Sequence, residues 1–163
     1  MERIRTLGIY QPFASLMLHG KIEIRVRRIN TKPPFPLGQY LIYSTKKRYS
    51  DGDLLPICGN EIRDNIFTVL KNDRTKDLDQ TAIAICTLVD VRPLSKSEED
   101  KAFVLFKGII TRLNKNTENS EQFIQYGLHF EKIQPIEPFK WTHGKQGTGF
   151  VPETELSKIK FQN

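Results

Sequence analysis

Apolar residues along the chain form short alternating or continuous runs, and these runs predict strands more often than helices. The strictest alternation is at residues 21–27, where Ile22, Ile24 and Val26 share one face and charged side chains share the other. Residues 81–91 are apolar through most of their length, which predicts a central position in a sheet. Further strand candidates are found at residues 7–10, 39–44, 128–136 and 149–151.

The helical patterns are few and short. Residues 11–19 predict a helix with Pro12 in its first turn, where a missing N–H costs nothing, and Gly20 at its end. Other helix candidates are found at residues 61–70, at 103–113 and after Pro152. Because strands and helices mix without the rhythm of βαβ units, the sequence predicts an α+β fold. A small, mostly antiparallel β-barrel flanked by helices describes this expectation best.

The charge of the chain is distributed unevenly, and this changes the picture of its partners. The net charge is +6, but residues 1–50 hold ten Lys and Arg against two Asp and Glu, whereas residues 51–100 hold six against eleven. A basic N-terminal third favours an anionic partner, because clustered cations displace counterions from a polyphosphate. A solvated, lysine-rich surface is the alternative. We expect one domain over residues 1–163, with the acidic residues around 50–80 as a surface insertion.

Cysteine and histidine usage restricts the remaining chemistry. Cys58 and Cys86 are too few for a disulfide framework, and Cys86 falls in an apolar run that predicts a buried position. The three histidines show no metal-ligand spacing, so we expect no metal, and nothing in the pattern calls for a cofactor. No apolar stretch is long enough for a bilayer, so the sequence predicts a cytoplasmic protein without a membrane partner.

Two basic segments are the strongest candidates for ligand binding. The charged face of the strand at 21–27 carries Lys21, Glu23, Arg25 and Arg27, a set of side chains that would fit an anion-binding cleft. The alternative is an edge strand whose charges prevent aggregation. The second segment follows residues 39–44 and includes Lys46 and Lys47, which could add contacts to a phosphate backbone, or could simply be a solvated loop. Tyr43 and Tyr49 lie near it as possible stacking rings.

Several segments in this order resemble the ASCH family, a branch of the PUA-like barrels. The opening Leu7–Leu16 looks like that family's apolar lead-in and its "Q-P-aromatic-A" helix start, and Gly20–Arg25 looks like its Gly, Lys and alternating Glu-x-Arg strand. The similarity continues in the second strand Gln39–Ser44, the central strand Ala84–Val91 and the closing turn Pro138–Gly147. Each segment is weak alone, and their order makes the resemblance.

The resemblance implies a pseudo-barrel with a cleft between the first helix and the strand at 21–27, and RNA or a nucleotide as its ligand, with Gln11 among the contacts. In some small members it implies hydrolysis of an acylated cytidine nucleoside, which here would use Lys21 and, more loosely, Glu98 or Glu99. Lys21 directly follows Gly20, however, and Ile22 stands where the family has Thr, so binding is favoured over hydrolysis. A small-ligand sensor or protein-interaction domain using the same cleft is the third hypothesis.

Overall fold

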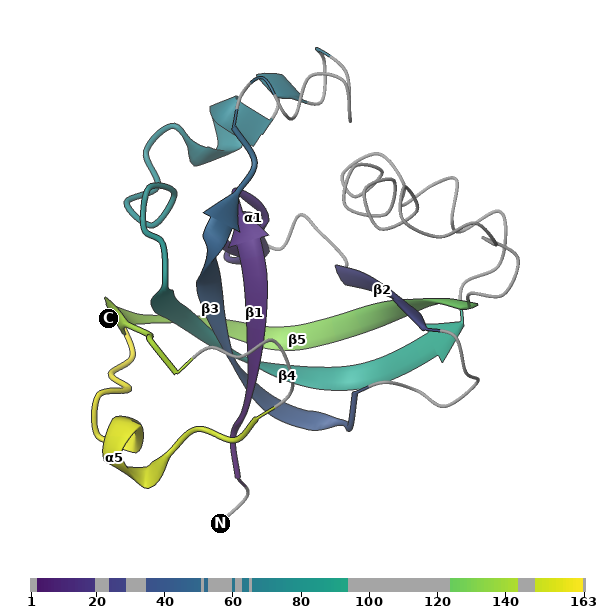
Figure 1. The fold of residues 1–163 in the computed structure, drawn as a ribbon, viewed down its shortest axis with the longest axis vertical. Helices are drawn as coiled ribbons and strands as arrows, with labels where there is room; N and C mark the ends of the chain where they lie inside the picture. The colour runs from purple at the N-terminus through teal and green to yellow at the C-terminus, as the bar shows by residue number, and fades with distance from the viewer. Residues whose placement is uncertain are drawn as a thin grey trace.

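The structure of the chain is a computed structural model. It describes residues 3–19, 24–28, 35–50, 52, 60, 63–64, 66–93, 124–143 and 149–162, with the backbone alone at 24–28, 92–93 and 124–127. The described residues form one five-stranded sheet with helical segments on either side of it (Figure 1). The predicted α+β class is therefore confirmed.

The strands of the sheet are arranged in the order β1-β3-β4-β5-β2. Only the β1–β3 pair is parallel, and the other three pairs are antiparallel, so the predicted predominance of antiparallel pairing is confirmed. The strand candidate at 81–91 occupies the central position, as expected from its apolar run. The strands are β1 (Arg5–Gln11), β2 (Ile24–Arg28), β3 (Gly38–Arg48), β4 (Thr81–Pro93) and β5 (Ile124–Lys140).

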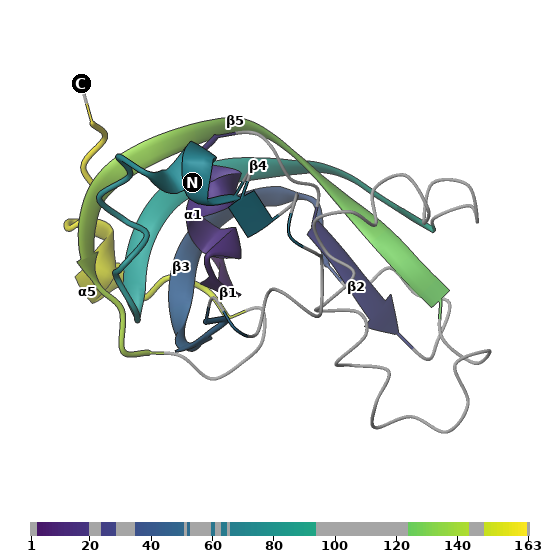
Figure 2. The same cartoon turned by 90° about the horizontal axis from the view of Figure 1, so that it is seen from above.

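The sheet is strongly curved, but it is not closed into a barrel, so that part of the prediction is wrong. Figure 2 shows β4 and β5 arching over α1, while β1 and β2 remain at the two edges without pairing to each other in the described residues. Three register shifts between β4 and β5 interrupt the ladder, and such bulges bend and twist a sheet. Alternating polarity along a strand shows which of its faces is buried. Because the same alternation occurs in an open curved sheet and in a closed barrel, it could not distinguish the two.

The inner, concave face of the sheet is covered by helix α1 (Phe13–Met17). Every residue of α1 is buried, and Phe13, Leu16 and Met17 join the core formed with β1, β3 and β4. The predicted helix at 11–19 is thus present but shorter, because residue 11 ends β1 and Pro12 caps the helix. Residues 66–70, within the candidate at 61–70, are helical and add Ile66 and Leu70 to the same core.

A second core lies on the opposite face of the sheet. Alternate residues of β3 divide between the two, with Tyr40 and Ile42 in the first core and Leu41 and Tyr43 in the second. Trp141 and the C-terminal segment cover the second face, and this segment includes the helix α5 (Glu153–Leu156), which begins directly after Pro152 as predicted. Because β3 and β4 are buried on both faces, their sequences read as apolar runs.

The outcomes of the remaining predictions differ. Cys86 is fully buried in the first core, and this burial raises the pKa of its thiol, as expected for a cysteine that acts as a small apolar residue. The segment at 149–151 forms a single bridge, Arg5 to Phe150, and no longer strand. Cys58, the helix candidate at 103–113 and the turn at 144–147 lie outside the described residues.

Candidate nucleic-acid interface

An irregularity in the parallel pair of strands determines how the basic cluster of β3 is presented. Ile9 pairs with Ser44 and Gln11 pairs with Arg48, so residues 45–47 of β3 lie opposite the single residue Tyr10. A bulge of this kind frees residues from the ladder and re-aims their side chains. Residues 45–47 are called the β3 bulge below. It lies at the end of the molecule where β1 leads into α1 (Figure 1).

The β3 bulge exposes two cations that no described carboxylate neutralises. Lys46 and Lys47 are exposed, and no carboxylate in the described part of the chain lies within ion-pair distance of either ammonium group. The next residue differs, because Arg48 donates from Nε and Nη2 to Oδ1 of Asp79 at 3.0 and 2.6 Å. The bulge therefore carries a local positive charge beside a neutral pair.

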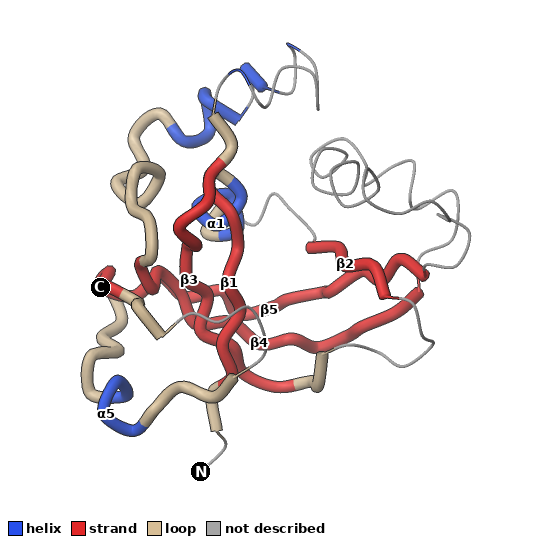
Figure 3. The backbone as a smooth tube through the Cα atoms, viewed as in Figure 1, coloured by secondary structure: helices blue, strands red, loops and turns tan. Residues whose placement is uncertain are grey.

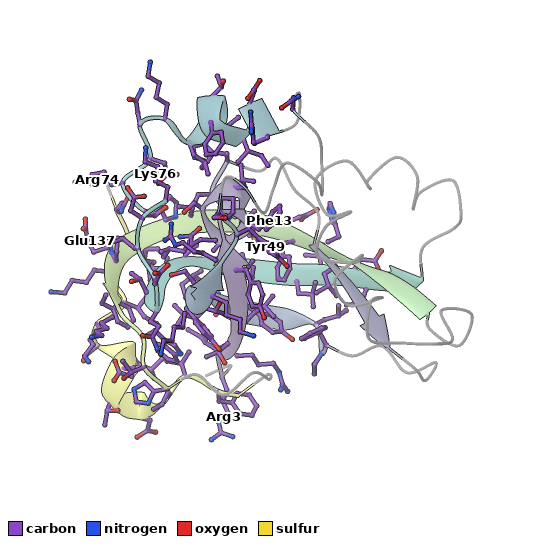
Figure 4. All side chains as sticks on the ribbon, turned by 45° about the horizontal axis from the view of Figure 1, so that its top comes forward. Arg3, Phe13, Tyr49, Arg74, Lys76 and Glu137 are labelled. Carbon is purple, nitrogen blue, oxygen red and sulfur yellow. The ribbon has the colours of Figure 1, made fainter. Side chains whose placement is uncertain are left out.

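Aromatic side chains support the bulge from within. The ring of Tyr49 lies 5.6 Å from the ring of Tyr10 and 5.6 Å from the ring of Phe13, centroid to centroid. Figure 4 shows Phe13 and Tyr49 together in the middle of the molecule. Tyr43 packs against Trp141 on the other face and is also buried. Tyr43 and Tyr49 are thus core rings, and their predicted availability for stacking on a base is wrong.

Beneath the bulge, the buried side chain of Gln11 joins β1 to α1 and to the loop at 71–80. Its amide N–H₂ donates to the carbonyl oxygens of Thr75 and Leu78, at 2.9 and 3.1 Å. Its carbonyl Oε1 accepts from the backbone N–H and the hydroxyl of Ser15, at 3.1 and 3.0 Å. All these partners are internal, so in this arrangement Gln11 positions the first helix, and its predicted contact with a ligand stays a prediction.

The network extends from α1 to a histidine at its end. The hydroxyl of Ser15 lies 2.7 Å from that of Thr75, which in turn donates to Oδ1 of Asp73 at 2.6 Å. The other carboxylate oxygen, Oδ2, lies 2.7 Å from Nε2 of the partly exposed His19. Figure 3 shows the loop that carries Asp73 and Thr75, the tan stretch that enters β4. A polar chain thus holds the end of β1, α1 and the loop at 71–80 together as one unit.

The electrostatics of the network favour an ionised carboxylate. Burial raises the pKa of Asp73, but hydrogen bonds from the hydroxyl and backbone N–H of Thr75 and from His19 outweigh this effect. The pKa of Asp73 is therefore held below its usual value of 3.8. This aspartate is therefore ionised at neutral pH, and its carboxylate oxygens are held by Thr75 and His19.

The other predicted residues do not all fall at this place. Arg25 and Arg27 lie on β2, where they pair with Gly127 and Gln125 of β5, at the sheet edge opposite β1. Their backbone is described, but their side chains are not. Lys21, Glu23 and Glu98 lie outside the described residues. The cleft predicted between the first helix and the strand at 21–27 therefore stays a prediction.

Sequence reasoning missed the polar network. Asp73 stood among scattered acidic residues whose simplest role is solubility, and His19 had no partner at a recognisable spacing. The predicted helix at 11–19 placed Gln11 and Ser15 one turn apart, whereas Gln11 is the last residue of β1 and reaches Ser15 across Pro12. Nothing in the sequence indicated that Thr75, sixty residues later, would complete the chain of bonds.

Two further findings concern the residues that the structure describes. No group of His, Cys, Asp and Glu side chains that the structure describes is arranged to hold a metal ion. None of the helices in those ranges has the length and apolar character that crossing a lipid bilayer requires.

Comparison with known proteins identifies the fold. No family model matches the chain, and no curated protein matches its sequence. Among solved structures it is similar to the crystal structure of ASCH from Zymomonas mobilis, with a TM-score of 0.52 and 13% identity over 96% of this chain and 92% of that one. Two point variants of that protein align with TM-scores of 0.49, at 14% and 13% identity, covering 96% of this chain and 93% and 96% of theirs. The first of these similarities supports the ASCH-like fold that the sequence resemblance implies, although the sheet is open and not a barrel.

Proposed function

We propose that this chain, which has the fold of an ASCH domain, binds RNA and contacts the phosphate backbone through Lys46 and Lys47 of the β3 bulge. One observation carries the proposal. The two ammonium groups are exposed and have no carboxylate partner in the described residues, although Asp79 neutralises the adjacent Arg48. Cations left unpaired in this way can each take the place of a counterion on a polyphosphate.

Structural rigidity supports the same surface. The bulge is held by pairing on both sides of it and by the bond from the Tyr49 N–H to the Gln11 carbonyl oxygen, at 2.8 Å. The buried network fixes the end of α1 beside it. A rigid support reduces the conformational entropy that binding would otherwise cost, although each lysine still orders its own side chain. Lysines act as point charges, so we expect little discrimination between sequences from these contacts.

A second contact would come from β2, in agreement with the cleft predicted from the sequence. This strand carries Arg25 and Arg27, and Lys21 and Glu23 precede it in the chain. The curvature of the sheet, which turns its β2 edge toward the side where α1 lies, supports this contact (Figure 2). An RNA strand lying on this side of the sheet would then meet cations of β3 and of the β2 edge.

Titration of a labelled single-stranded RNA, followed by fluorescence anisotropy at several salt concentrations, tests the proposal. We expect the affinity to fall steeply as salt rises, because bound counterions are released when the complex forms. Absence of binding at low salt, or an affinity independent of salt, would contradict the proposal. Release of acetate from an acetylated cytidine in a parallel assay, lost in Lys21→Ala, would instead support the hydrolase hypothesis.

A further inference from the structure

A cavity of about 260 Å³ lies at the start of β1, at the end of the molecule far from the β3 bulge. Its walls are Arg3, Arg5, Leu37, Gly38, Gln39 and Phe150. Figure 4 shows Arg3 at the lower end of the molecule, apart from Phe13 and Tyr49, the rings that support the bulge. The cavity thus belongs to a different surface from the one proposed for RNA backbone binding.

Both arginines of the cavity pack on one aromatic ring. The guanidinium carbon of Arg3 lies 4.5 Å from the centroid of Phe150, and that of Arg5 lies 4.4 Å from it. Stacking on a ring holds a guanidinium by its face and leaves its N–H edges available to a ligand. Phe150 as a whole residue remains 39% exposed, so it also offers an apolar surface.

The positive charge of the pair is not balanced by any acidic side chain that the structure describes. No carboxylate in the ranges that the structure describes lies within ion-pair distance of Arg3 or Arg5, and the two guanidinium groups share one ring. Two cations that pack on the same ring both attract an anion, and an anion that reaches both would lower the electrostatic energy of the pair. A dianion with several acceptor oxygens matches two planar donor forks better than a single carboxylate does.

The backbone around the cavity is fixed before any ligand arrives. Phe150 bridges to Arg5, and the flanking bonds are Thr6 N–H to Gly149 O and Val151 N–H to Ile4 O, each 2.8 Å long. On the other wall, Gly38 has φ +134° and no atom lies within 4 Å of the place of a β-carbon. The side chain of Leu37 is 62% exposed and adds apolar surface next to it.

We propose that this cavity binds the terminal phosphate monoester of a nucleotide. The phosphate would accept hydrogen bonds from Arg3 and Arg5, and the base would lie against the exposed apolar surface of Leu37 and Phe150. The amide of Gln39 can both donate and accept, as the edge of a base or a ribose hydroxyl requires. A free nucleotide and the phosphorylated end of an RNA strand share this chemistry.

The test uses the full chain and adenosine monophosphate, with adenosine and inorganic phosphate as comparison ligands. In amide NMR spectra we expect the monophosphate to shift the signals of Arg5, Gly38, Gln39 and Phe150, and adenosine to bind far more weakly. Arg3→Gln removes an exposed side chain next to the chain end and should leave the fold intact. It should weaken monophosphate binding about tenfold or more, because charge-assisted contacts are the strong ones. Arg74→Gln, the control on the distant loop, should change nothing.

The outcomes separate this site from the proposed RNA surface. Weakening by Arg3→Gln and Arg5→Gln with no effect of Lys46→Gln supports the cavity. If the two arginine substitutions also weaken the binding of an RNA with a terminal phosphate, and leave the binding of the same RNA without that phosphate unchanged, the RNA end is the source of the ligand. If they weaken only the binding of adenosine monophosphate, the source of the ligand is a free nucleotide. Absence of shifts at the four amides, or unchanged affinity in both folded arginine variants, would overturn the proposal.

Discussion

The hydroxyl of Ser15, in the first helix, lies 2.7 Å from the hydroxyl of Thr75, in the loop that leads into the central strand. Both side chains are buried. The Thr75 hydroxyl donates to Oδ1 of Asp73, so the single proton of the Ser15 hydroxyl is shared between the Thr75 oxygen and Oε1 of Gln11. This contact closes a chain of polar bonds between segments sixty residues apart. It makes the position of α1, and with it the support of the β3 bulge, dependent on the loop at 71–80.

Replacing Thr75 should therefore destabilise the fold. Thr75→Val keeps the shape of the side chain but removes the hydroxyl bonded to Ser15 and Asp73, so a buried hydroxyl and a carboxylate each lose a partner. We expect the free energy of unfolding in urea to fall by about 1–3 kcal/mol. The matched control is Thr68→Val, whose hydroxyl is exposed and bonds only to the Asp64 carbonyl oxygen. Equal effects of the two substitutions would contradict the role assigned to the network.

The carboxylate of Asp73 should make stability depend on pH in acid. Its pKa is lower in the folded chain than its usual value of 3.8, so its contribution is complete above pH 3.8 and is lost as the pH falls through the folded-state pKa. The difference in unfolding free energy between the wild-type chain and Asp73→Asn should then be largest above pH 3.8 and shrink below it. Urea titrations over this pH range measure the difference. A difference that grows toward low pH would show that the sign is wrong.

Gly8 should not accept a side chain. A β-carbon at this position would lie 2.7 Å from Cζ of Tyr43, closer than packed atoms come, and the ring is held in the second core by Trp141. Gly8→Ala should reduce the free energy of unfolding by about 1–3 kcal/mol, the usual cost of overpacking.

Gly149→Ala is the matched control for this substitution, because its β-carbon would meet nothing nearer than the Thr6 hydroxyl at 3.7 Å. In a double-mutant cycle, Gly8→Ala should cost less in a Tyr43→Ala background than in the wild-type chain. An equal cost in both backgrounds would mean that the ring does not cause the effect.

The sequence predicted which segments form strands and helices better than it predicted whether the sheet closes into a barrel. Strong local patterns, such as the apolar run at 81–91, fix which segments are strands, and the buried position of β4 follows from that run alone. The open curvature of the sheet depends on register shifts between β4 and β5, and these arise from the packing of whole strands. No local pattern of residues announces such shifts.

The candidate site could be predicted only in part, again because contacts between distant segments are not visible in the sequence. Lys46 and Lys47 were identified because clustered cations are visible in any sequence, and the structure describes both as exposed. Arg3 and Arg5 were counted only as part of the basic N-terminal third, since their aromatic partner Phe150 lies at the other end of the chain. Contacts between distant segments decide which cations face a hollow, and composition alone does not contain that information.

The central claim is that the two lysines of the β3 bulge contact RNA phosphates. The most direct measurement is the salt dependence of RNA affinity for Lys46→Gln/Lys47→Gln, set against Lys132→Gln/Lys140→Gln, which removes two exposed lysines of β5. We predict that the first pair lowers the affinity and reduces the slope of log affinity against log salt by roughly 0.7 for each lysine lost, while the second pair leaves both unchanged. Identical slopes for the wild-type chain and the bulge variant would contradict the claim.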